Sequence, residues 1–434
     1  MDFSPFLIKR LHVSFLLHVS FLLIIAFPLV LLQACAQAQS PNADIGKLFV
    51  PDTSKLIEVR IDPLLAKAGE LTSTLFDSVI YLPLQTNKRS AFGEISQMEV
   101  TSKYYIIWDA VSNSILFFTK EGRFFTKITN TDKSVKTPYK KINQFTVNEQ
   151  KNELVFNDVH SPYLYFYTLE GKFIKNIEKP DYIGSTFISF ADYSLYLQGY
   201  DSSSSKSLQI PPSNLIITKD GEKKAWYLPF DTLALNYTDL FTVDKSFYNN
   251  QNGIIHFSTT YDYNIYSIDS SAHMFNSFRF VMPATNAIPN DFMIDAKYKD
   301  KRMAYTNSNE EVIYSVTDFY QNNNDITFRL FGHSINQTFS YNLKTGNLKS
   351  LSNIVSDKFT YMLPIIKRKI HALDSRKNLI SSIDAITLFD AKFKLGGNKT
   401  WDSSLPASLK EFFKSDNQQN EVLTIMRLKQ ENLN

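Results

Sequence analysis

The single cysteine of the chain, Cys35, is the side chain whose type and position point most directly to a chemical reaction. It follows Leu32-Gln33-Ala34, and an apolar run from Leu11 to Leu32 precedes it, with Lys9 and Arg10 at its start. A cysteine thiolate is a nucleophile, and a small residue, Ala34, precedes this one. One cysteine also excludes a disulfide scaffold and a cysteine-rich zinc module.

This arrangement resembles the bacterial lipobox. The resemblance implies that residues 1–34 are a lipoprotein signal peptide, that cleavage falls before Cys35, and that the sulfur and the new amino terminus of Cys35 are acylated. Gln33 stands where Ala, Ser or Thr is usual. Two alternatives stay open: a secretory signal cut after Ala36 or Ala38, and a retained membrane helix, which needs about 20 apolar residues.

The lipid interpretation also predicts a location. Several acyl chains hold a protein firmly on a bilayer, since each buried methylene contributes about 0.8 kcal/mol. Ala36 gives no acidic signal after the cysteine, which favours the outer membrane of a bacterial cell envelope over the inner membrane. Residues 35–75 are predicted to be a tether and lead-in segment, because the first part is polar and has no hydrophobic period.

Elsewhere the sequence shows no motif of an enzyme. It lacks a nucleophile elbow, a His-Glu-x-x-His pair, a phosphate loop and a dinucleotide fingerprint. We therefore assign no catalytic residue, no metal ligand, no ligand-binding residue and no cofactor. The 46 basic and 43 acidic residues give a net charge of +3, which offers no electrostatic case for nucleic acid. Five histidines follow Cys35, none at ligand spacing: His160, His256, His273, His333 and His371.

Three local clusters have structural interpretations. The aromatic stretches 160–167 and 261–266 could stack on sugars or peptides, but alternate aromatics in strands favour packing between neighbouring sheets. The basic run Lys367–Lys369 predicts a solvated edge that blocks strand addition.

The elements that would position these side chains are short strands. Runs such as Tyr104–Trp108 and Ser114–Phe118 are rich in β-branched and aromatic residues and end at Asn, Asp, Ser or Gly. Helical periodicity is absent over most of the chain, and 44% hydrophobic residues exclude extensive disorder. One helix is predicted, over Leu405–Phe413, with Ser404 as its cap.

A repeated turn organises the strands. Gly122, Gly171, Gly221, Ser271 and Gly346 occupy equivalent positions in hairpins, 49, 50, 50 and 75 residues apart. Glycine supplies the positive φ that closes such a hairpin. A period near 50 fits one four-stranded propeller blade, and the long last interval predicts an insertion or a degenerate blade around residues 283–325.

A propeller must close its ring, usually by pairing strands from the two ends of the chain. Val79–Leu84 and Val422–Leu428 are the predicted pair, in one sheet. The span between them accommodates either six or seven blades by length alone.

The opening and the end of this span resemble the six-bladed β-propeller lipoproteins of Bacteroides-type bacteria. The resemblance implies an all-β fold of six four-stranded antiparallel blades over residues 76–430, with a short helix near the C-terminus. This chain departs from the family pattern at two places. Gln85 stands where Glu is usual, and Lys136–Lys140 stands where the family has a glycine-rich turn. The stretches that carry the resemblance are 78–86, 92–96, 106–109, 117–124 and 420–429.

Two functions follow as expectations. The first is a non-catalytic binding or scaffold module, a monomer anchored to the membrane through Cys35, which holds a protein, peptide or glycan partner. The second is a propeller hydrolase or lyase of the lactonase type, with a metal in the central channel. Three or more carboxylates and histidines converging at one channel mouth would favour the enzyme, whereas a lining of Ser, Asn and apolar residues would favour binding.

Overall fold

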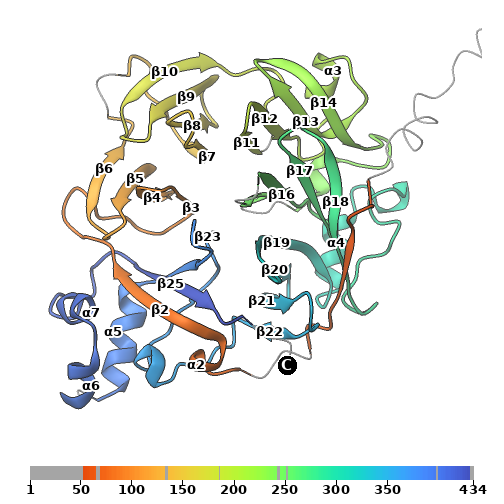
Figure 1. Cartoon of the computed structure of the whole chain (residues 1–434). Helices are drawn as coiled ribbons and strands as arrows, with labels where there is room; N and C mark the ends of the chain where they lie inside the picture. The colour runs from red at the N-terminus through yellow and green to blue at the C-terminus, as the bar shows by residue number, and fades with distance from the viewer. Residues whose placement is uncertain are drawn as a thin grey trace, which may run out of the picture. The chain divides into compact units, whose positions relative to one another are not determined.

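The computed structural model describes residues 52–64, 69–131, 135–184, 186–241, 245–250, 253–396 and 399–430. These residues form six mainly antiparallel sheets arranged as the ring of a six-bladed β-propeller (Figure 1). The predicted all-β fold and the number of blades are confirmed. Among the described residues, no helix is long and apolar enough to cross a membrane.

The first three blades follow one another along the chain, and each begins with its innermost strand. Blade 1 contains β3 (Gln97–Val100), β4 (Tyr104–Asp109), β5 (Ser114–Thr119) and β6 (Phe124–Ile128); blade 2 contains β7 (Ile142–Asn148), β8 (Glu153–Asp158), β9 (Tyr163–Thr168) and β10 (Phe173–Glu178); blade 3 contains β11 (Thr186–Phe190), β12 (Tyr193–Leu197), β13 (Ser213–Lys219) and β14 (Glu222–Pro229).

Blades 4 and 5 repeat this order, and blade 6 takes its outer strand from the N-terminal side of the chain. Blade 4 contains β15 (Phe247–Asn250), β16 (Ile254–Phe257), β17 (Asn264–Asp269) and β18 (Met274–Val281); blade 5 contains β19 (Ile313–Asn322), β20 (Asp325–Gly332), β21 (Asn336–Asn342) and β22 (Leu348–Ser350); blade 6 contains β23 (Ala372–Leu373), β24 (Leu379–Ile383), β25 (Val422–Leu428) and β2 (Phe76–Pro83).

The repeated turn joins the third and fourth strands in blades 1 to 5. Its glycines adopt the positive φ angles that the sequence predicts, 78° at Gly122 and 72° at Gly346. In the copy that lacks glycine, Ala272 takes the left-handed conformation, with a φ of 65°. The hairpin geometry is therefore retained where its usual residue is missing.

Ring closure also follows the prediction. β2 pairs with β25 in antiparallel register, with Val79 opposite Met426 and Tyr81 opposite Thr424.

The middle strands are buried because they pack between neighbouring blades; β5, for example, is buried from Ser114 to Phe118. The aromatic stretches 160–167 and 261–266 lie in this packing, and Tyr165 stacks on Phe156 with ring centroids 5.2 Å apart. Their predicted packing role is confirmed.

Residues 52–64 add a strand that the repeats did not indicate. β1 (Ile57–Arg60) pairs in parallel with β18 and makes blade 4 a five-stranded sheet. Val59 of this strand is fully buried in the core. Part of the segment expected to be a lead-in thus covers the outer edge of blade 4.

The insertion in front of blade 5 occupies residues 282–312, between β18 and β19. The predicted range was therefore correct at its start and too long at its end, since β19 is a regular blade strand. Arg302, at the start of α4 (Arg302–Ser308), is fully buried and donates hydrogen bonds to the backbone carbonyls of Ala234 and Phe292. It also pairs with Asp239 at 3.5 Å, which anchors the insertion.

Helices surround blade 6 and are more numerous than predicted. α5 (Ala385–Lys394) and α6 (Lys399–Ser404) precede the expected helix, which is α7 (Ala407–Phe412). The predicted cap is wrong, because Ser404 ends α6 and its hydroxyl donates to the carbonyl of Trp401, while Pro406 precedes α7. The remaining helical elements are short turns: α2 (Thr72–Leu75), α3 (Ser203–Ser207), η2 (Tyr237–Asp239), η3 (Ala296–Tyr298) and η4 (Lys358–Thr360).

Candidate ligand-binding site

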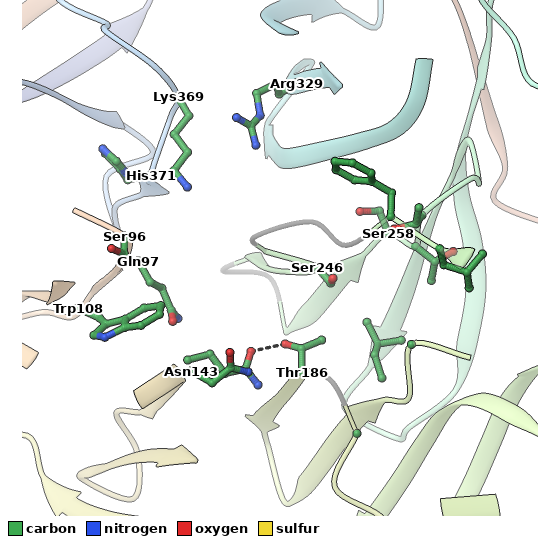
Figure 2. Close-up of a pocket in the computed structure, with 18 of the residues that line it drawn as sticks. Ser96, Gln97, Trp108, Asn143, Thr186, Ser246, Ser258, Arg329, Lys369 and His371 are labelled. Carbon is green, nitrogen blue, oxygen red and sulfur yellow. Dashed lines mark hydrogen bonds between the residues drawn. The ribbon is translucent and has the colours of Figure 1, made fainter. Parts of the chain in front are cut away.

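A cavity of about 1080 Å³ lies at one mouth of the central channel, and all six blades contribute to its lining. The lining residues stand where inner strands begin, as at Gln97 of β3 and Thr186 of β11, or where second strands end, as at Trp108 of β4. Figure 2 shows these side chains around the cavity together with Asn143 and Ser258. Hydroxyl and amide groups dominate the lining from blades 1 to 4.

Side-chain hydrogen bonds join neighbouring blades around this mouth. The Gln97 amide donates to the carbonyl of Phe145 (2.6 Å) and accepts from its N–H (3.0 Å), which connects blade 1 to blade 2. Thr186 donates to the side-chain oxygen of Gln144, which connects blade 3 to blade 2 (Figure 2). Tyr320 donates to the carbonyl of His371 at 2.8 Å between blades 5 and 6. The wall is therefore a preorganised polar ring.

An ion pair crosses the channel below this ring. Lys245, just before β15 of blade 4, lies 3.2 Å from Glu99 of blade 1. Glu99 is two residues beyond Gln97 on β3, so it faces the channel on the same side of the strand and further in. Because blades 1 and 4 are opposite in a six-membered ring, the pair bridges the channel beneath the cavity.

Positive charges gather on the wall formed by blades 5 and 6. Arg329 of β20 is 8% exposed and its Nε lies 2.9 Å from a carboxylate oxygen of Asp318. Lys367, Arg368 and Lys369 also line the cavity. Lys367 and Arg368 are exposed, as predicted for a solvated edge. The run leads into β23, the innermost strand and one edge of the blade 6 sheet, so its charges lie at the channel mouth.

His371 is the histidine that lines the cavity, and it is buried and uncharged. Its Nε2 lies 2.8 Å from the hydroxyl of Ser382. Burial, with the nearby charges of Lys369, Lys245 and Arg329, lowers the pKa of His371 to about 3. Glu421, at the same wall, has its pKa raised by burial. The wall thus keeps its histidine neutral.

The other four histidines lie apart from the cavity. His256 is buried in β16 with its Nδ1 2.6 Å from the hydroxyl of Ser267, and burial lowers its pKa to about 4. His273 lies 3.8 Å from Asp52 at the outer side of blade 4. His160 and His333 are exposed. Within the described part of the chain, no group of three or more His, Cys, Asp or Glu could hold a metal ion.

Three further positions singled out in the sequence are Cys35, Gln85 and the stretch Lys136–Lys140. Cys35 lies outside the described residues. Gln85 accepts from the N–H of Phe124 at 2.9 Å and donates its own N–H to Gly122, so it secures the turn of blade 1. Tyr139, in the Lys136–Lys140 stretch, is buried against Phe156 and does not line the cavity.

The cavity residues form no sequence motif because they are spread over all six blades, from a single residue of blade 5 to twelve of the blade 3 segment. A weak signal was present in the repeat. Gln97 stands 25 residues before Gly122, and Ser246 stands 25 residues before Ser271. In blades 1 and 4 this position marks the start of the inner strand, where the channel mouth is built, whereas in blades 2, 3 and 5 the same spacing falls elsewhere in the blade.

The ring of six sheets and the polar cavity at its mouth define a six-bladed β-propeller with a candidate ligand site. The sequence matches, over residues 62–427, the family described as a domain of unknown function, DUF4934, and the chain belongs to this family. No curated protein is significantly similar in sequence.

Three solved structures are similar to this chain, and the first of them shows the same fold. The "Putative exported protein" of Bacteroides fragilis NCTC 9343 is 14% identical, with a TM-score of 0.67 over 86% of this chain and 100% of its own. A member of the DUF4221 family from Bacteroides vulgatus is 10% identical, with a TM-score of 0.43 over 82% and 98%. Virginiamycin B lyase from Staphylococcus aureus is 14% identical, with a TM-score of 0.36 over 70% and 80%.

Proposed function

We propose that this protein is an exported, lipid-anchored binding module that holds a polar ligand at the channel mouth without transforming it. The observation that carries the proposal is the cavity itself. It is formed by all six blades, and most of its polar lining consists of hydroxyl and amide side chains, with four cations (Arg329, Lys367, Arg368 and Lys369) and five carboxylates (Glu94, Asp181, Asp201, Asp384 and Glu421) among them. Within the described residues, no three of these carboxylates and His371 are grouped so that they could hold a metal ion. Ligand sites are commonly concave, with polar groups placed to fix orientation.

The position of these groups suits recognition. The inter-blade hydrogen bonds of Gln97 and Gln144 hold the wall before any ligand arrives, so little ordering cost remains to be met on binding. The Lys245–Glu99 pair crosses the channel beneath the cavity, which favours a ligand that is held over one that passes through. A monomer suffices, because one chain completes the ring.

Export and lipid attachment are the second part of the proposal. The similarity to an exported protein of Bacteroides fragilis supports export, and Leu32-Gln33-Ala34-Cys35 supports lipid attachment at Cys35 in the outer membrane. The described propeller would then lie outside the cytoplasm, tethered by the residues that follow Cys35. Its partner would be a protein, a peptide or a glycan of the cell envelope.

Metabolic labelling with an alkyne-tagged fatty acid tests the anchor. We expect label in the wild-type chain and in a Ser415→Ala control, and none in Cys35→Ala, which should also leave the detergent phase of a Triton X-114 partition. A Cys35→Ala chain that is still labelled and processed normally would remove the lipoprotein part of the proposal.

A cavity-filling variant tests the site. Ser246 faces the cavity (Figure 2), so Ser246→Trp should block the ligand, whereas Ser415→Trp, on an exposed residue after α7, should not. The wild type and both variants are compared on glycan and peptide arrays. Compounds retained by the wild type and by Ser415→Trp but lost by Ser246→Trp support the proposal. Equal retention by all three, or conversion of a retained compound to product, would overturn it.

A further inference from the structure

The wall between blades 5 and 6 differs from the rest of the cavity in charge. Arg329 and Lys369 extend into the cavity from neighbouring elements of blades 5 and 6 (Figure 2). Both influence His371, as does Lys245. Three cationic side chains from three blades therefore act electrostatically on one neutral histidine.

An ion pair without hydrogen-bond geometry and an aromatic ring both contact the guanidinium of Arg329. Asp318 contacts its Nε at 2.9 Å, and the ring of Phe331 lies 5.2 Å from its central carbon. A guanidinium has four more N–H donors on its two Nη atoms, in a planar fork that matches a carboxylate. Because the arginine is only 8% exposed, an anion meeting this fork would be largely removed from water, where charge-assisted hydrogen bonds are strong.

The other charged side chains of the lining lie on blade 6 beside Lys369, on the blade 1 rim, and on the blade 3 side. Lys367 pairs with Asp384, and Arg368 lies 3.5 Å from Glu94 at an exposed part of the rim. Asp181 and Asp201 belong to the blade 3 side, where they accept hydrogen bonds from the Ser207 hydroxyl and the Ser203 N–H. Glu421 lies at the blade 6 wall, where burial raises its pKa.

The remaining lining is suited to a hydroxyl-rich molecule. Asn143, Ser246 and Thr260 come from blades 2 and 4, and Trp108 of blade 1 offers an aromatic ring at the same mouth. Side-chain amides and hydroxyls both donate and accept hydrogen bonds, as sugar hydroxyls do.

A peptide backbone finds fewer free partners along the inner edges of blades 2 and 3. A peptide would add to the innermost edge of a blade through main-chain hydrogen bonds. On β7, however, the N–H and the carbonyl of Phe145 are both already bonded to Gln97. The N–H of Ser189 in β11 likewise donates to Thr146 at 3.4 Å. Side chains of neighbouring blades thus occupy inner-edge positions that a peptide strand would use.

We propose that Arg329 and Lys369 form a carboxylate subsite and that the cavity binds an acidic sugar, with its carboxylate at the blade 5 and 6 wall and its hydroxyls toward blades 1 to 4. This inference rests on the proposed binding function and names its ligand class.

Calorimetric titration with three probes tests it: the disaccharide of glucuronic acid and glucose, its neutral counterpart cellobiose, and the blocked acidic dipeptide Asp-Glu. We expect the acidic disaccharide to bind, more tightly than the other two. Arg329→Gln and Lys369→Gln should each weaken its binding about 10- to 100-fold, as expected when one charge-assisted contact is lost. Arg427→Gln and Lys127→Gln, on β25 and β6 away from the cavity, should leave it unchanged.

Since Arg329→Gln leaves the buried Asp318 without its partner, Lys369→Gln keeps the test decisive if the arginine variant folds poorly. Equal affinity for cellobiose, preference for the dipeptide, or affinity unchanged by Lys369→Gln would overturn the acidic-sugar inference. So would the absence of binding by the acidic disaccharide at millimolar concentration. In all of these cases the Ser246→Trp comparison still decides whether the cavity binds a ligand at all, so the two proposals fail separately.

Discussion

The two buried histidines show how single residues depend on the blades around them. His256 and His371 each bond a serine hydroxyl, and burial lowers their pKa values to about 4 and about 3. At His371 the cations of blades 4, 5 and 6 lower the pKa further. Both rings are therefore neutral in the folded chain at any physiological pH.

We predict that this neutrality makes the fold sensitive to acid. The folded pKa values lie below the ordinary value of 6.5, so the unfolded chain binds more protons as the pH falls below 6.5. The contribution of the two histidines to stability is complete above pH 6.5 and is lost as the pH falls toward 4 and 3. Each histidine contributes at most about 1.4 kcal/mol per pH unit to this loss.

Urea unfolding at pH 7, 6 and 5 measures the effect. The pH dependence of the unfolding free energy should become shallower in His371→Gln, whatever the absolute stability of that variant. The exposed His160→Gln should keep the wild-type slope, which separates this effect from the titration of carboxylates. Identical slopes in the wild type and His371→Gln would contradict the prediction.

At the scale of elements, the repeated hairpin turn contributes differently from blade to blade. Gly122 and Gly346 both have positive φ, but a Cβ at Gly122 would lie 2.5 Å from the carbonyl oxygen of Pro83 in β2. At Gly346 the nearest atom would be the Tyr341 hydroxyl at 3.7 Å. The turn of blade 1 thus packs directly on the outer strand of blade 6, whereas the turn of blade 5 is open.

We predict that Gly346→Ala costs about 1 kcal/mol, because the left-handed conformation disfavours alanine. Gly122→Ala should cost about 2 kcal/mol or more, since the backbone of β2 must also move. Thermal and urea unfolding of both variants measure the difference, and Gly346→Ala serves as the matched control for the conformational cost. Equal losses would show that blade 1 and β2 adjust freely to the added methyl group.

The same elements explain what the sequence could predict. The turn glycines were recognisable because the requirement for positive φ is local, and their spacing then defined the blades. The helices α5 and α6 were not, since they are stabilised by packing on blade 6; Leu388 is fully buried there, while Phe393 on the same helix is 85% exposed. The hydrophobic periodicity of the segment does not show which of its apolar residues pack on blade 6.

The candidate site was less predictable than the fold. Gln97, Thr186, Arg329 and Lys369 are far apart in sequence, and only closure of the ring brings them to one cavity. The charges of Lys367–Lys369 predict a solvated edge from local sequence alone. The position of this run at the channel mouth depends on how blade 6 is assembled around β23. The lipidation of Cys35 stays a prediction of the sequence.

At the scale of the whole molecule, the ring depends on one strand. β25 lies between β24 and β2 and joins the C-terminal part of blade 6 to the strand supplied from the N-terminal side. Val422, Leu423 and Met426 of this strand are fully buried. Without β25, β2 would lose its strand partner. Blades 1 and 5 would then lose the complete blade 6 sheet that lies between them in the ring.

We predict that a chain ending at residue 421 loses cooperative unfolding, whereas a chain ending at residue 430 unfolds as the full-length protein does. The reason is that an unclosed ring exposes the faces of two blades, which a propeller otherwise buries against neighbours. Circular dichroism during urea titration, together with hydrogen exchange of blade 3, measures the outcome. Blade 3 is farthest from the cut, so loss of protection there would show that closure stabilises the entire ring. If blade 3 stayed protected in the chain ending at residue 421, the blades would be independently stable units and the closing strand a local feature of blade 6.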